Sequence, residues 1–192
     1  MKKFELTTDK IKSNGVTLHR IKALIDFGDV KAGEWGGYVE KETNLSQYGG
    51  AWVYTHAQVY GNAQVFGQAL VYGNAQVFGN ARIFDYARIF GNARISGNAH
   101  IFGDSLVYGN ACMCDNAQVS SDADYICLKG FGSRNRNTTM FRTENGNICV
   151  SCGCFIGSLQ EFENKVKETH GNNKFAKEYL ALVEAAKIHF EV

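Results

Sequence analysis

The sequence predicts a mainly β protein: a parallel β-helix of hexapeptide repeats between an N-terminal cap and a small C-terminal α+β unit. Three observations support this fold class. Residues 49–126 divide without a gap into thirteen hexads. The fifth hexad position is Val or Ile in eleven of them, and the third is Ala in twelve. The chain also holds 21 glycines and no proline, which favours many similar tight corners.

A period of six residues fits neither an amphipathic helix nor a single alternating strand. It fits a short strand followed by a corner, with three such sides closing one coil. The aliphatic residue then points to the centre, and the small Ala packs beside it. Gly-Asn pairs such as Gly61-Asn62 supply the left-handed backbone that a corner needs. Successive coils are expected to pair as parallel strands about 4.8 Å apart.

Residues 1–48 are expected to form the N-terminal strand and cap. A solenoid exposes strand edges at its ends, and these edges need covering. The pattern over residues 16–27 predicts a strand. The side chains expected to plug the first coil are Trp35, Tyr38, Val39 and Leu45.

After the repeats, residues 127–137 (CLKGFGSRNRN) are glycine-rich and basic, and they are predicted to be a crossover loop. Residues 138–192 are predicted to form a hairpin followed by two helices. Asn145-Gly146 is a strong hairpin signal between strands expected at 138–144 and 147–156.

The two helices are indicated by their end signals. Ser158 and Glu161 form a capping box that opens the first helix, and Gly171 ends it. The second helix is expected to begin near Asn173. The apolar faces are expected to be Leu159, Phe162 and Val166 on the first helix, and Phe175, Tyr179, Leu182, Val183 and Ala186 on the second.

Charge and composition exclude several classes of protein. The net charge is +1, and basic and acidic residues are evenly spread, so general nucleic-acid binding is not expected. The first residues contain no apolar signal core, and no apolar run reaches the roughly 20 residues that span a bilayer. We expect a cytoplasmic protein that does not bind membranes, with its six cysteines as free thiols.

The hexads resemble those of the hexapeptide-repeat left-handed β-helix family, and this resemblance implies a left-handed coil. Residues 19–54 (HRIKALIDFGDVKAGEWGGYVEKETNLSQYGGAWVY) also resemble the segment leading into the repeats of uncharacterised phage and prophage proteins of the "polymer-forming" type. The resemblance implies a phage or prophage setting but no agreed activity. Trimers are common among hexapeptide-repeat proteins.

The outward positions differ among the three faces of the predicted helix, because residues three hexads apart share a face. One face, called face one here, has apolar side chains at both outward hexad positions, the fourth and the sixth. Such a surface usually marks an interface, so we expect self-association, as a trimer first and a dimer second. On the other faces, aromatic columns are expected only to stabilise the strands by stacking. The expected interface residues are Trp52, Tyr54, Leu70, Tyr72, Phe90, Leu106 and Tyr108.

Basic residues are the candidates for binding an anion or an acidic partner. Arg82, Arg88 and Arg94 fall on three different faces and cannot converge within one subunit. The candidates are therefore Arg88 on face one, where a partner's copy can approach, and a C-terminal cluster of Arg134, Arg136 and Arg142.

Catalytic and metal sites are weakly indicated. The resemblance to hexapeptide acyltransferases implies a catalytic histidine and a long insertion over the substrate. Here the hexads run without insertion, and His56 and His100 are expected to be surface residues. The γ-class carbonic anhydrases, which share the fold, bind zinc through three histidines that this repeat lacks. The cluster of Cys149, Cys152 and Cys154 is expected to hold free thiols. We expect no catalytic residue, cofactor or metal.

The sequence thus favours a non-catalytic, oligomeric binding or scaffolding protein. One version is a phage counter-defence factor that sequesters a host protein or a nucleotide signal. The alternative from another class is an acyltransferase-like enzyme with its site between subunits. A purely structural polymer is disfavoured, because capping sequence is expected at both ends of the repeat.

Overall fold

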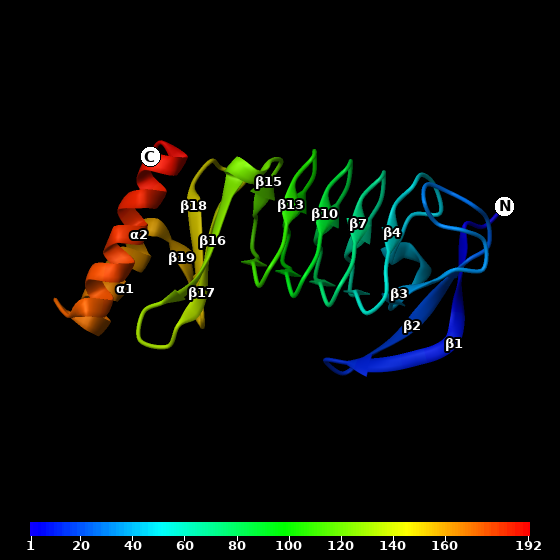
Figure 1. Ribbon diagram of the computed structural model, residues 1–192, viewed down its shortest axis with the longest axis horizontal. Coiled ribbons are helices and arrows are strands. Elements are labelled where there is room, and N and C mark those ends of the chain that lie inside the picture. The colour runs from blue at the N-terminus through cyan, green and yellow to red at the C-terminus, as the bar shows by residue number, and fades with distance from the viewer.

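The hexads build a three-sided β-solenoid, as predicted (Figure 1). The computed structural model describes all residues, 1–192. Twelve two-residue strands form the coils, and partners in neighbouring coils are 18 residues apart, as in the pairs Leu70↔Arg88 and Arg88↔Leu106. The strands are β4 Trp52–Val53, β5 Gln58–Val59, β6 Gln64–Val65, β7 Leu70–Val71, β8 Gln76–Val77, β9 Arg82–Ile83, β10 Arg88–Ile89, β11 Arg94–Ile95, β12 His100–Ile101, β13 Leu106–Val107, β14 Cys112–Met113 and β15 Gln118–Val119.

Each face of the solenoid is one parallel sheet. Face one is the sheet β13-β10-β7-β4, and face three is the sheet β15-β12-β9-β6. Face two is the run β5-β8-β11-β14, which continues into the N-terminal strands. The fifth-position side chains of the coils, from Val53 to Val119, are fully buried along the axis. Burying this aliphatic stack is the main source of solenoid stability.

The two residues at each corner have different roles. The first corner residue takes positive φ, as in Gly79 (φ 70) and, without glycine, Asp85 (φ 54). At Gly79 a Cβ would also lie 3.0 Å from the backbone N of Gly97 in the next coil, so space as well as φ favours glycine. The second corner residue links coils, because Asn80 donates an amide hydrogen bond to Asn98 at 3.0 Å. Asparagine therefore joins the corners into a ladder.

The N-terminal cap is an antiparallel extension of face two. Strand β1 (Phe4–Ser13), which the sequence analysis did not predict, pairs with β2 (Val16–Ala23), and β2 pairs with β3 (Trp35–Val39). Strand β3 then pairs in parallel with β5 and so joins the cap to the first coil. A 3₁₀ turn, Glu42–Asn44, follows. The predicted strand over 16–27 ends early, because the chain turns back between Phe27 and Val30.

The predicted plug of the first coil is partly wrong. Val39 and Leu45 are buried as expected, but Trp35 is 46% exposed and its ring lies beneath the cationic group of Arg20. The indole that fills the end of the coil is Trp52 instead. Its ring is 0% exposed and packs edge-on against the rings of Phe4 and Phe27.

The predicted crossover loop at 127–137 is also wrong. Strand β16 (Tyr125–Phe131) pairs antiparallel with β17 (Arg136–Arg142), so the segment is one side of a hairpin and not a loop. The solenoid ends after β15, because the last hexad forms a 3₁₀ turn at Asp122–Asp124 before β16 begins. The glycines that suggested a loop instead lie at an irregularity in the strand pairing and at the turn.

The hairpin at Asn145-Gly146 is confirmed, and it joins β17 to β18 (Ile148–Cys152). A second turn at Gly153 (φ 65) divides the segment predicted as one strand, so β19 (Phe155–Ser158) pairs back on β18. Both predicted helices form, as α1 (Leu159–His170) and α2 (Lys174–Phe190), with Ser158 and Asn173 as N-caps. Neither helix is long and apolar enough to cross a membrane.

The sheet β16–β19 is a layer between the solenoid and the helices (Figure 1). Successive residues of β17 point to opposite sides of this layer. Phe141 joins the core of the solenoid, whereas Met140 joins the core beneath α1 and α2. The C-terminal unit thus closes the solenoid of its own chain and carries the helices outward.

Candidate functional site

Face one presents a continuous column of aromatic rings. The ring of Tyr72 stacks on that of Phe90 with centroids 5.0 Å apart, and Phe90 stacks on Tyr108 at 5.3 Å. Tyr54 meets Tyr72 edge-on at 6.4 Å. Tyr108 is 53% exposed, so the column stays open to solvent at its C-terminal end.

The fourth hexad position separates face one from the other faces. On face one, Leu70 and Leu106 flank Arg88 in adjacent coils and are only partly buried. On face three, the same position carries Gln64, Arg82, His100 and Gln118. Face one therefore carries leucines on both sides of Arg88 at the position where face three is polar throughout.

One residue assigned to this surface does not lie on it. Trp52 occupies the outward position of face one in the hexad pattern, but Phe4 and Phe27 of the N-terminal cap cover it completely. The prediction that Trp52 contributes to an interface is wrong, since a side chain buried within its own chain cannot contact a partner.

The three arginines of the solenoid have different surroundings. The guanidinium of Arg82 lies 5.1 Å from the ring centroid of Phe66, and that of Arg94 lies 5.6 Å from Phe78. Arg88 has neither an aromatic ring nor a carboxylate in such a position. It borders an open hollow of about 400 Å³ with Tyr54, Leu70 and Tyr72. Arg88 is the arginine of the solenoid with capacity left for an external contact.

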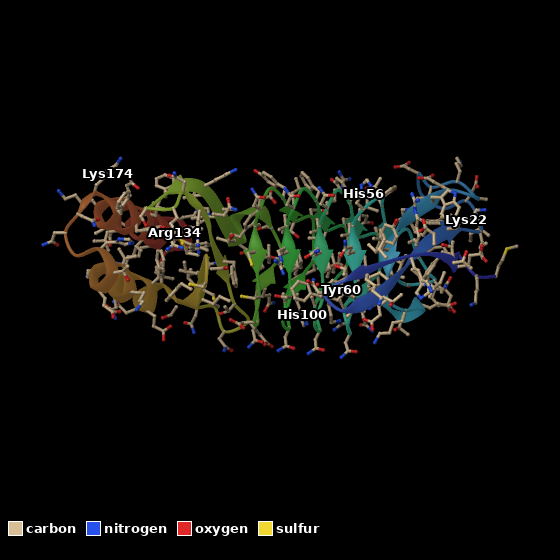
Figure 2. All side chains as sticks on the ribbon, turned by 90° about the horizontal axis from the view of Figure 1, so that it is seen from below. Lys22, His56, Tyr60, His100, Arg134 and Lys174 are labelled. Carbon is tan, nitrogen blue, oxygen red and sulfur yellow. The ribbon has the colours of Figure 1, made fainter.

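Face two is covered at its N-terminal end. The tip of the β1–β2 hairpin lies against it near Tyr60, where the side-chain amide of Asn14 donates to the Tyr60 hydroxyl at 2.9 Å (Figure 2). Ser13 donates to Gln58 at 2.7 Å in the same region. The chain's own cap thus occupies part of this face, while the aromatic column of face one remains open.

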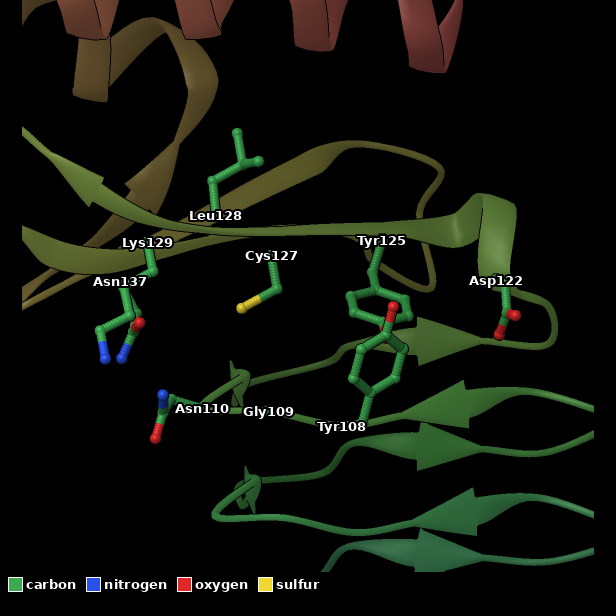
Figure 3. Close-up of a pocket in the computed structure, with 9 residues that line it drawn as sticks. All are labelled: Tyr108, Gly109, Asn110, Asp122, Tyr125, Cys127, Leu128, Lys129 and Asn137. Carbon is green, nitrogen blue, oxygen red and sulfur yellow. The ribbon is translucent and has the colours of Figure 1, made fainter.

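A cleft extends face one to the C-terminal unit (Figure 3). It has a volume of about 350 Å³ and lies between the last coil and β16. The rings of Tyr108 and Tyr125 lie side by side at one end, and the Tyr125 hydroxyl donates to the carbonyl of Leu106 at 2.7 Å. The polar side chains of the cleft, none of which the sequence pattern indicated as a site, are Asn110, Asp122, Lys129 and Asn137.

The predicted C-terminal arginine cluster is divided. Arg142 donates a hydrogen bond to the carbonyl of Phe190 at 2.9 Å and lies 3.5 Å from the carboxylate of Asp124. It therefore ties α2 to the end of the solenoid, and its assignment to the cluster is wrong. Arg134 and Arg136 remain together and border a cavity of about 550 Å³ in the C-terminal unit.

The histidines are dispersed over the molecule. His56 lies at an exposed corner, and His100 lies on face three with its ring 6.4 Å from that of Phe84 (Figure 2). His19 and His189 hydrogen-bond to backbone carbonyls of Thr7 and Ala123. His170 stacks on Tyr179 in the C-terminal unit. No histidine of the solenoid has a hydrogen-bonded carboxylate in the single chain.

The cysteines are free thiols in contrasting surroundings. Burial, together with the nearby carboxylate of Asp115, raises the pKa of Cys114 to about 12 and that of Cys149 to about 11. Cys154 lies exposed in the β18–β19 turn. No three side chains of His, Cys, Asp or Glu are grouped so that they could share a metal ion.

These surroundings predict an order of thiol reactivity. Because the thiolate is the reactive form, raised pKa values and burial should protect Cys114 and Cys149 at pH 8. We expect iodoacetamide to label Cys154 first in the native protein, and Cys114 and Cys149 only after unfolding in denaturant. Peptide mass spectrometry over a time course measures this order. Early labelling of Cys114 in native protein would contradict the packing described here.

Comparison with known proteins finds similarity over part of the chain. The family model for the YdcK beta solenoid repeat matches residues 57–73 and 87–103. The coils are similar to YdcK-type repeats. A curated relative from Escherichia coli (strain K12), named "Uncharacterized acetyltransferase YdcK", is 45% identical over 51 residues. The similarity covers 27% of this chain and 15% of the relative, so it extends over a small part of each protein.

Proposed function

We propose that the protein is a self-associating binding or scaffolding protein whose face one docks against a second copy of the same chain. The observation that carries this proposal is the aromatic column of face one with Leu70 and Leu106 beside it, all on the outside of a single chain. The solenoid then acts as a rigid body that holds the C-terminal units of the oligomer at defined positions.

A second copy fits this surface for two reasons. Both copies repeat with the same spacing between coils, so the rings and leucines of one can fit between those of the other along the face. The guanidinium of Arg88 also lies over no aromatic ring of its own chain, whereas those of Arg82 and Arg94 each lie over one. A ring of the partner's column supplies the missing contact for Arg88.

We expect a trimer first and a dimer second, as the hexapeptide-repeat resemblance implies. The stacked rings alone do not argue for an interface, because Phe66, Phe84 and Phe102 form the same kind of column on face three. What favours face one is the pair of leucines at the position where face three carries polar and charged side chains.

Replacing Tyr72 and Leu106 together by Lys should weaken self-association and leave the solenoid folded. The two changes place like charges against a partner's copies of the same residues and remove apolar contact. We expect native mass spectrometry and light scattering to show a shift toward monomer, with at least a tenfold weaker association constant, roughly 1.4 kcal/mol.

The matched control is Phe102→Lys with Gln118→Lys, which makes the same charge change at equivalent outward positions of face three. This variant should keep the wild-type mass. An oligomer unchanged by the face-one substitutions, or dissociated equally by both pairs, would place the interface elsewhere. A monomeric wild type at micromolar concentration would remove the proposal.

The biological setting we infer is phage or prophage counter-defence, with capture of a host protein or nucleotide signal. Its support is the resemblance of residues 19–54 to segments of phage proteins. Expression of the chain in a plating panel of defended bacteria tests it, and this setting is wrong if no defence system is relieved.

An acyltransferase with a site between subunits is the second candidate. It is favoured by the name of the relative, an uncharacterized acetyltransferase. Within one chain, His100 lies beside Arg82 and Gln118, so a carboxylate partner would have to come from a neighbouring subunit. Calorimetry with acetyl-CoA separates the candidates, since the scaffolding function requires no CoA binding.

A further inference from the structure

The C-terminal unit contains a cavity of its own, apart from face one. It lies between the turn that joins β16 to β17, the turn that joins β18 to β19, and one side of α1 and α2. Its volume of about 550 Å³ is within the range of sites for small molecules. Arg134, labelled in Figure 2, belongs to the first of these turns.

Basic groups dominate the polar lining. Arg134 and Arg136 have no carboxylate within salt-bridge distance, whereas Arg20 and Arg142 each have one. Lys165 and His170 also line the cavity. Two unpaired guanidinium groups beside one cavity favour an anionic ligand.

The acidic groups nearby are already paired. Lys165 lies 2.8 Å from Glu168 on the exposed side of α1. Glu178 lies 3.5 Å from Lys174 and accepts the backbone N–H of Gly132 at 2.9 Å. Neither carboxylate is paired with Arg134 or Arg136, so these two arginines carry the positive charge of the site.

The rest of the lining is aromatic and aliphatic. Phe162 packs against both Phe155 and Tyr179, with ring centroids 5.3 Å and 5.5 Å away. The imidazole of His170 stacks on Tyr179 at 5.9 Å. A cavity lined by cationic groups and aromatic side chains suits a molecule that has both a charged and a flat apolar part.

The turns that border the cavity pack closely on their neighbours. Gly132 has a φ of 72°, and a Cβ there would overlap the hydroxyl group of Tyr179, so the turn packs closely on α2. At Gly153 a Cβ would likewise overlap the guanidinium of Arg136, so the second turn packs closely on that side chain. Glycine at both turns allows the backbone to approach and holds the two sides of the cavity together.

We propose that this cavity binds a small phosphorylated molecule with an aromatic ring system, of the size of a nucleoside monophosphate. The phosphate lies between Arg134 and Arg136, because a phosphate dianion can accept hydrogen bonds from two guanidinium groups at once. The ring system lies against Phe155, whose side chain is only partly buried, with the buried Phe162 packed behind it. This site is separate from the self-association of face one and does not depend on it.

Calorimetry with adenosine monophosphate, inorganic phosphate and adenosine tests the proposal on the full chain. We expect the monophosphate to bind more tightly than phosphate alone, and adenosine to bind more weakly than the monophosphate. Arg134→Gln and Arg136→Gln should each weaken binding of the monophosphate by roughly tenfold or more, because each removes a charge-assisted hydrogen bond.

The matched control is Arg94→Gln on face two, which makes the same change where the neighbouring coil already carries Gln76. It should bind as the wild type does, and thermal melts should show that all three variants fold. No binding of the monophosphate up to about 10 mM would overturn the proposal. Equal affinity for adenosine and the monophosphate, or wild-type affinity in both cavity variants, would also overturn it. The face-one variants should retain binding, so the two proposals can fail separately.

Discussion

Val77→Asp is expected to abolish cooperative folding of the solenoid. Val77 is 0% exposed and lies in a central coil, paired between Val59 and Ile95 of the adjacent coils. A carboxylate there would meet only aliphatic side chains, and its burial without a partner costs several kcal/mol. Because small domains are stable by about 5–15 kcal/mol, one such change removes much of the total. Circular dichroism during thermal unfolding measures the effect.

Gln76→Asp is the control for this prediction. It places the same side chain one residue earlier, where the position points outward and is only partly buried. The loss is limited to the 3.3 Å hydrogen bond with Gln58, so a destabilisation of about 1 kcal/mol is expected. A wild-type melting temperature for Val77→Asp would contradict the inward orientation of the fifth hexad position.

Trp52→Ala is expected to destabilise the N-terminal end of the solenoid by about 3–5 kcal/mol, the usual cost of removing a large buried ring. Trp52 is fully buried beneath Phe4 and Phe27, so truncation leaves a cavity that the cap cannot fill without moving. Equilibrium unfolding in urea measures the free energy.

Trp52→Phe distinguishes the contribution of the buried ring from that of the indole N–H group. The indole Nε1 is buried without a hydrogen-bond partner, so phenylalanine loses ring volume but also removes an unsatisfied donor. We expect Trp52→Phe to destabilise by much less than Trp52→Ala. Equal losses for the two variants, or a loss below about 1 kcal/mol for alanine, would contradict the packing of the cap.

Repetition explains why the solenoid could be predicted closely. In each coil the same local rule applies, with an aliphatic residue inward, Ala beside it and a positive-φ residue at the corner. The helix ends could be predicted for a similar reason, because the capping box of Ser158 and Glu161 involves residues three apart. Signals of this kind depend on neighbours in the sequence or on an exact repeat.

The candidate sites could be predicted only in part. Face one follows from the repeat, and Leu70, Tyr72 and Leu106 lie where the hexads place them. The cavity of the C-terminal unit does not follow from any local pattern. It brings Arg134 and Arg136 together with His170 and Tyr179, which belong to two helices far along the chain.

The sequence by itself determined the three-sided coil, its inward stack, the apolar character of face one and the order of the C-terminal hairpin and helices. Only the tertiary structure decided that Trp52 is covered while Trp35 is exposed. The residues that cover Trp52 belong to the N-terminal cap, whose strands lie far before it in the sequence. It also decided that β16 continues where glycines suggested a loop, and that Arg142 donates a hydrogen bond to the last residue of α2. In each case a contact between distant segments outweighed the local preference of the residues involved.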